Sequence, residues 1–325
     1  MTLLSLAMGR LAQALLLLFV MSLIGFAGVH AVGNPVYNVV NIETASAEDI
    51  RLATIALGLD QPLWRQYLLF VSNALQGNFG TSYIYHQPAF SLVMSKLPAT
   101  LELACCAMLV AAPLGTMLGL LAGARPGSLL DRIVLQTAIG ALSIPSFWLS
   151  MMLILVGAVA TGWFPASGRA ATTDLLDQQW SFATADGLRH MVLPVLALAI
   201  PNAALIARLA RAGTIDVEHL EFSRFCRAKG LSARRILFRH TLPNISLPIV
   251  TIVGLQFGGM LAFAVVVESI FAWPGIGKLL IDSIQLLDRP VVMATLTFIS
   301  VAFVTLNAVV DLFHALLDPR VRVGA

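Results

Sequence analysis

Charged residues are scarce in this chain. Asp, Glu, Lys and Arg make up 11% of its 325 residues, whereas a soluble domain carries about 25%. Hydrophobic residues make up 58%, and the mean hydropathy is +0.86. Because a water-soluble fold cannot bury so much apolar surface, we expect the chain to be surrounded by lipid.

The sequence also lacks the residue patterns of metal and catalytic sites. Its three cysteines, Cys105, Cys106 and Cys226, form no CxxC pair and imply no disulfide framework. The six histidines are dispersed, without ligand spacing on one helix, and neither HExxH nor GxSxG occurs. We therefore expect neither a metal site nor an enzyme active site.

A complete ATP-binding loop is missing as well. Gly277-Lys278, in the segment FAWPGIGKLL, matches the end of a phosphate-binding loop. However, Ala272 occupies the position of the first glycine, and Leu279 stands where Ser or Thr must bind Mg²⁺. We expect no cofactor to bind to this chain.

What the sequence does contain is long apolar runs. Six segments are long enough to cross a hydrocarbon core of about 30 Å, which takes about 20 residues. The first could be a signal peptide, but it has no clear cleavage site and five more spans follow, so we interpret it as a retained helix. The six predicted spans are Leu11–Val32, Thr100–Ala122, Ile133–Ala160, Met191–Leu209, Ile245–Val267 and Val291–Leu316.

The positive charges are distributed unevenly between the connections. Of 20 Lys and Arg residues, one lies at the N-terminus, two in 123–132, eight in 208–243 and two at the C-terminus. The positive-inside rule therefore places both termini and the 208–243 loop in the cytoplasm. The net charge of +3 is small, and the positive residues cluster in one loop, which favours membrane topology over binding to a nucleic acid.

The 208–243 loop has a regular pattern. Acids early and bases late predict a helix over Thr214–Ala228, which Gly230 would end. Ser232 would cap a second helix, Ala233–Thr241, just before Pro243. One interpretation is a protein-binding surface of apolar and Arg side chains; the alternative is a solvated basic face whose phenylalanines rest on lipid headgroups. The apolar residues of that face would be Phe222, Phe225, Ala228 and Leu231.

The 33–97 connection is long for a membrane loop. Ser46 would cap a short helix that Gly58 ends, and a second helix would cover Pro62–Leu75. Its aromatic stripe suits either an interfacial anchor or a rim that contacts a delivery protein. That stripe is Trp64, Tyr67 and Phe70.

A few carboxylates fall within or beside the apolar spans. Glu102 lies near the start of the second span, Glu268 ends the fifth, and Asp311 lies in the sixth. Such groups are costly in lipid and often line a path, although near an interface they can also snorkel or pair. Their scatter does not predict a proton relay.

The cytoplasmic loop resembles the signature of ABC importer permeases, in which a coupling helix sits in a groove of the ATPase subunit. The family pattern is E-A-A, three residues, Gly, nine residues, I-x-L-P. Gly230 and Leu242-Pro243 keep this spacing, whereas 224–226 read RFC and His240 replaces Ile. The stretch RFCRAKGL is similar to the peptide-type branch.

Further segments resemble the permeases for dipeptides, oligopeptides and nickel. They are LGLDQPLWRQY (57–67), GNFGTS (77–82), LPATLELA (97–104), VVVESIFAWPGIGKLL (265–280) and LDPRVRV (317–323). Two positions depart from the family: Asn34 and Asn78 stand where it usually has Asp.

The resemblance implies an all-α polytopic permease with six transmembrane helices in the bacterial inner membrane. It implies one domain over 1–325, an outer loop over 33–97 and a coupling loop over 210–243. The coupling residues would be Glu221, Phe222, Arg224, Phe225, Arg227, Ala228, Lys229, Gly230 and Leu231. The path candidates are Glu102, Glu268, Phe271, Trp273 and Pro274.

The implied partners are a second, homologous but different permease, two ATPase subunits that hold ATP and Mg²⁺, an outer binding protein and membrane lipid. No nucleic acid is expected. A self-sufficient secondary transporter would instead show inverted repeats, and the two halves of this sequence show no repeat. An intramembrane enzyme would need a nucleophile or metal motif, which the sequence lacks.

Overall fold

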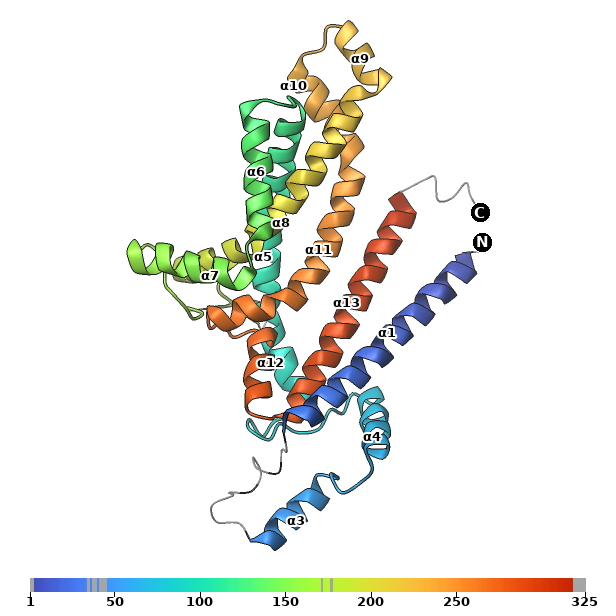
Figure 1. The fold of residues 1–325 in the computed structure, drawn as a ribbon, viewed down its shortest axis with the longest axis vertical. Coiled ribbons are helices and arrows are strands. Elements are labelled where there is room, and N and C mark those ends of the chain that lie inside the picture. The colour runs from blue at the N-terminus through green and yellow to red at the C-terminus, as the bar shows by residue number, and fades with distance from the viewer. Residues whose placement is uncertain are drawn as a thin grey trace. The chain divides into compact units, whose positions relative to one another are not determined.

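The computed structural model describes residues 3–33, 36, 40, 46–170, 172–175 and 178–317, and this part is almost entirely helical (Figure 1). The chain forms two compact units. Unit 1 comprises residues 1–100 and 274–304, and unit 2 comprises residues 101–273 and 305–325. The prediction that 1–325 acts as one permease domain stays a prediction.

Among the described residues, five helices are long and apolar enough to cross a membrane, and a bent helix pair makes a sixth span if it is counted as one. Each overlaps a predicted span, which confirms the all-α polytopic class. The five helices are α1 (Leu3–Val32), α5 (Ala89–Gly123), α8 (Ala185–His219), α11 (Leu242–Ile270) and α13 (Arg289–Leu317).

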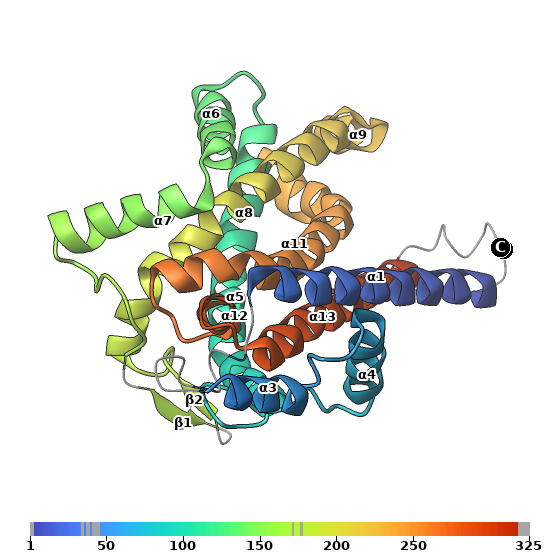
Figure 2. The ribbon, with the colours of Figure 1, turned by 60° about the horizontal axis from the view of Figure 1, so that its bottom comes forward.

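The third span differs from its prediction as one continuous helix. It consists of α6 (Leu129–Ser143) and α7 (Ser146–Ile154), which meet at 103°, and α7 continues into a π-helical turn, η1 (Leu155–Ala160) (Figure 2). Pro145 explains the bend, because a residue before proline avoids the helical region. Ile144 accordingly has an extended ψ of 124°.

Helix α8 is the central helix of unit 2, where it packs against α6, α7 and α11. It is longer than the predicted Met191–Leu209 and includes both Pro194 and Pro201. The Thr184 hydroxyl caps its start by accepting the Gly187 N–H at 2.9 Å.

Three glycines on one face of α5 bring that helix into backbone contact with α8. A Cβ on Gly115 would lie 2.6 Å from the Ala203 carbonyl oxygen, and one on Gly123 would lie 2.6 Å from Thr214 Cβ. Gly119, between them, faces the Ala207 carbonyl oxygen. This spacing of small residues permits close helix packing in lipid, where burial of apolar surface gives no driving force. We call this contact the glycine seam.

Hydrogen-bonded polar pairs connect α8 to α6 and α11. Arg211 of α8 donates to the Asp131 carboxylate of α6, with Nη2 2.9 Å from Oδ2. Gln256 of α11 donates to Asn202 of α8 at 2.8 Å. Both pairs satisfy polar groups that are buried or half-buried in the protein and would be costly without a partner.

Unit 2 also contains a small sheet that the sequence analysis did not predict. Strands β1 (Thr173–Leu175) and β2 (Gln178–Trp180) pair antiparallel, with Asp174 opposite Gln179 (Figure 2). They precede α8 in the connection that follows η1.

The two short helices predicted in unit 1 are confirmed. Helix α3 (Ala47–Ala56) begins with a reciprocal capping box, and hydrogen bonds from Ser46 hold the pKa of the Asp49 carboxylate below its ordinary value. Gly58 follows with a φ of +67°, and α4 (Leu63–Leu75) begins after Pro62.

The aromatic stripe of α4 is divided between two environments. The Tyr67 hydroxyl is hydrogen-bonded to Ser22 of α1 at 2.8 Å, and its ring lies 5.3 Å from that of Phe26. Phe70 also contacts Phe26, whereas Trp64 is 66% exposed. Only Trp64 is therefore available for the interfacial or rim role that the sequence suggested for all three.

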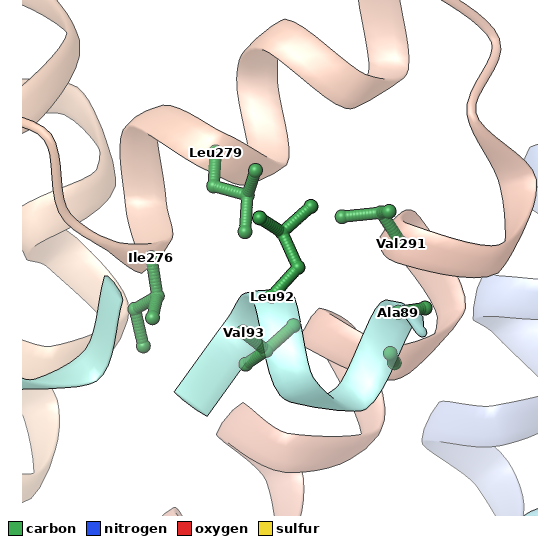
Figure 3. Packing of buried hydrophobic residues seen from close by; sticks show 7 residues of the cluster. Ala89, Leu92, Val93, Ile276, Leu279 and Val291 are labelled. Carbon is green, nitrogen blue, oxygen red and sulfur yellow. The ribbon is translucent and has the colours of Figure 1, made fainter. Parts of the chain in front are cut away.

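The core of unit 1 lies where the first turns of α5 and α13 meet α12 (Ile276–Gln285). Leu92 of α5 points toward Leu279 of α12, with Val291 of α13 beside them (Figure 3). A buried hydrogen bond from Ser82 to Asp288 ties the 77–88 segment to the start of α13, and the Tyr83 N–H donates to the same carboxylate at 3.2 Å.

The glycine seam predicts that a side chain added at its positions, but not at other glycines, destabilises the fold. Gly119→Val places two methyl groups against the α8 backbone and should destabilise the fold by about 1–3 kcal/mol, seen as a lower Tm in detergent. Gly140→Val in α6 is the matched control, because its Cβ meets nothing within 4 Å. Equal Tm values for the two variants would contradict the seam.

Candidate functional site

The helix predicted over Thr214–Ala228 is in fact broken at Leu220. Helix α8 runs to His219, Leu220 is extended, and a separate helix, α9, covers Glu221–Ala228. Arg227 explains the break, because it bonds back to Glu218 near the end of α8. Its Nη1 lies 3.0 Å from Glu218 Oε2, and its Nη2 donates at 2.9 Å to the Glu218 carbonyl, one of the helix-end acceptors that need a partner.

Helix α9 has one buried and one exposed face. Ser223 and Cys226 are buried. Phe225 is 59% exposed, with Lys229 Nζ 4.6 Å from the centre of its ring. Phe222 and Leu231 are half-buried, so the exposed apolar surface is narrower than the sequence suggested. The other exposed residues are Glu221, Arg224, Arg227, Ala228, Lys229 and Gly230.

The turn after α9 follows the prediction in part. Gly230 has a φ of +75°, and the Ser232 hydroxyl caps α10 (Ala233–Ile236). The predicted helix end before Pro243 is wrong: a π-helical turn, η2 (Leu237–Thr241), leads directly into α11, with Pro243 in its first turn. Proline removes one backbone donor, and a π-helical turn accommodates such a loss without ending the helix.

Glu218 was predicted only as one of the acids in the early turns of the Thr214–Ala228 helix, and sequence reasoning missed its role as a link. One of its carboxylate oxygens binds Arg227 of α9, and the other accepts the Thr241 hydroxyl at 3.2 Å. Glu218 thereby connects the end of α8, α9 and the turn that starts α11. No local signal marks it, because its partners lie 9 and 23 residues away.

On unit 2, the path candidate Glu102 lies in a buried polar cluster. Its Oε2 accepts from Arg169 at 2.6 Å, and its Oε1 accepts the N–H groups of Ser181 and Phe182 at 2.5 and 2.7 Å. The carboxylate is fully buried and has a donor on each oxygen. It thus anchors the connection that contains β1 and β2 to α5.

Arg169 extends this cluster to Trp273. Its guanidinium also binds the Ser181 hydroxyl at 2.9 Å and lies 5.5 Å from the centre of the Trp273 ring. The Gly168 N–H donates to the Phe271 carbonyl at 2.8 Å. We call Glu102, Arg169 and Trp273 the Glu102 cluster.

The remaining path candidates differ in burial. Glu268 and Phe271 are buried, like Glu102 and Trp273, and Pro274 is half-buried. The structure brings Glu102 and Trp273 together through Arg169, which sequence reasoning did not single out. Asn34, the side chain of Asp311 and residues 318–323 lie outside what is described.

These features define a class: a multi-pass helical membrane protein that presents an exposed amphipathic helix between two of its spans. The family "binding-protein-dependent transport system inner membrane component" matches residues 115–323, and the model of its N-terminal part matches residues 3–104. The chain belongs to this family and is a permease subunit of an ABC importer. In this family, separate ATPase subunits hydrolyse ATP.

Similar proteins cover nearly the whole chain. The di/tripeptide transport system permease DppB of Pseudomonas aeruginosa is 37% identical over 96% of this chain and 97% of its own length. The glutathione transport system permease GsiC of Escherichia coli K12 has the same identity and coverage. A crystal structure of an amino acid ABC transporter with histidines shares the fold, with a TM-score of 0.50 and 18% identity over 70% of this chain and 94% of that one.

The Glu102 cluster predicts that removing one of its charges destabilises the fold more than removing both. Arg169→Ala leaves the Glu102 carboxylate buried without its cation, and breaking a buried pair costs about 3–5 kcal/mol. We expect a clear drop of Tm in detergent, and a smaller one when Arg169→Leu is combined with Glu102→Leu. Arg189→Ala is the control, since that guanidinium makes an exposed hydrogen bond to Trp163 O. A Tm for Arg169→Ala equal to that of the control would refute the assignment.

Proposed function

We propose that this permease forms half of the translocation path for short peptides, together with a second, different permease subunit. The relatives that match it along nearly their whole length are named for di- and tripeptides and for glutathione, itself a tripeptide. Both termini would lie in the cytoplasm, and a binding protein would deliver the peptide from the outer side.

The exposed face of α9 carries the proposed contact with the ATPase subunits. Phe225 supplies an exposed aromatic anchor, and Arg224 and Lys229 flank it with positive charge. Aromatic residues and arginines are enriched in protein interfaces and dominate their binding energy. Because Arg227 is engaged by Glu218, its part in this proposal is to hold α9 in position.

Glu218 offers a route for the motion that ATP binding produces. A displacement of α9 acts through Arg227 on the end of α8, and through Glu218 on Thr241 at the start of α11. Both helices would then shift together, exchanging inward for outward access of the path. On the outer side, Glu102, Glu268, Phe271, Trp273 and Pro274 remain the proposed path residues.

The subunit composition tests the proposal most directly. We expect this chain, purified in mild detergent, to retain two ATPase subunits and one second permease, as identified by mass. Two copies of this chain in one complex would contradict the heterodimer. Recovery of the chain alone, with transport intact after reconstitution, would favour a secondary carrier.

A substitution on α9 separates coupling from folding. Phe225→Asp should lower substrate-stimulated ATP hydrolysis roughly tenfold or more, because interface anchors of this kind contribute about 2 kcal/mol or more. Phe147→Ala, at another exposed aromatic residue of unit 2, should leave coupling unchanged. Normal ATPase stimulation in Phe225→Asp would exclude this face as the docking site.

A further inference from the structure

Unit 1 contains an apolar cavity of about 270 Å³ between α1, α12 and α13. Gly28 and Val29 line it from α1, Ser283 and Leu287 from α12 and the residues that follow it, and Arg289 and Leu296 from α13. Nearby, Gly25 packs closely on α13, since a Cβ there would lie 3.1 Å from Leu296 Cδ1. We call this space the α1–α13 cavity.

Two polar atoms of the residues that line this cavity are buried without a hydrogen-bond partner among the described residues. They are the Ser283 hydroxyl oxygen and Arg289 Nε. Arg289 does use Nη2, which donates to the Gly33 carbonyl at 2.6 Å. A guanidinium has five donors, and a buried unsatisfied donor is costly. An anionic acceptor beside Arg289 would satisfy this group.

Arg289 also borders a second, more polar space of about 770 Å³. His30, Asn78, Tyr83 and His86 line that space, and Val29 and Arg289 are common to both. Arg289 therefore stands where an apolar cavity meets a polar one. That arrangement is complementary to an amphiphile with an apolar chain on one side of an anionic group and a polar moiety on the other.

The position of the cavity along the spans agrees with such a ligand. Gly28 precedes the end of α1 at Val32 by four residues, or about 6 Å at a rise of about 1.5 Å per residue. Arg289 is the first residue of α13. Both therefore lie at the end of a span, at the level of lipid headgroups rather than of the hydrocarbon core. Arginine binds phosphate at such positions through paired, charge-assisted hydrogen bonds.

We propose that unit 1 binds one anionic phospholipid, with its phosphate on Arg289 and an acyl chain in the α1–α13 cavity. The lipid would fill the space between α1 and α13 and thereby support the packing of the first helix. This role is separate from peptide transport and from docking of the ATPase subunits, so either proposal can fail without the other.

Filling the cavity tests the acyl-chain position. A Cβ on Gly28 meets nothing within 4 Å, so Gly28→Leu should occupy the cavity without displacing the backbone. Gly140→Leu is the matched control, because that helical glycine also has open space and lies in unit 2. Native mass spectrometry of the complex with its partner subunits should show one phospholipid fewer per chain in Gly28→Leu than in the wild type or Gly140→Leu.

Removing the charge tests the phosphate position. Arg289→Gln should weaken phosphatidylglycerol binding to the delipidated complex roughly tenfold or more, because hydrogen bonds to a charged group contribute that much. Arg289→Lys, which keeps the charge, should recover part of the affinity. Millimolar inorganic phosphate should not displace the lipid, since it has no acyl chain.

Three results would overturn the proposal. One is equal lipid retention by the wild type and Gly28→Leu. Another is loss of the second permease from the Gly28→Leu complex, which would identify the cavity as a protein interface. The third is displacement by inorganic phosphate, which would identify a site for a soluble anion.

Discussion

The close approach of α5 and α8 along the glycine seam is the constraint on which most of unit 2 depends. Within lipid, apolar side chains gain nothing by leaving their surroundings, so helices associate through close packing and hydrogen bonds. Gly119 and its neighbours leave no room for a side chain at the α8 backbone. Because α8 also packs against α6, α7 and α11, the seam fixes the helix around which the unit is built.

Polar side chains then set how the elements around α8 are placed. Arg211 binds Asp131 of α6, Asn202 binds Gln256 of α11, and Glu102 binds the connection that leads into α8. Each group is costly in an apolar medium unless it is paired, and a pair satisfies both partners at one geometry. The small residues permit close packing, and the polar pairs select a particular arrangement.

Close packing and polar pairs also have separate roles at the loop between α8 and α11. The body of α8 is held by packing, whereas its end is held by Glu218, which reaches both α9 and η2. An exposed helix with such a connection can transmit a displacement to two spans at once. This connection is the basis of the coupling route proposed above, because separate ATPase subunits hydrolyse ATP in this family.

By itself, the sequence determined the lipid environment, the six spans, the family pattern and the local signals. The caps at Ser46 and Ser232 and the turns at Gly58 and Gly230 depend on nearby backbone alone, and all four were predictable. The bend before Pro145 also has a local cause, although the continuous apolar run predicted a single straight span there.

Only the tertiary structure decided the break at Leu220, the continuation past Pro243 and the partner of Glu102. Arg169 lies 67 residues from Glu102, and the glycines of α5 find their partners on another helix. Such contacts depend on which surfaces meet in space, and neither hydropathy nor residue spacing along the chain contains that information.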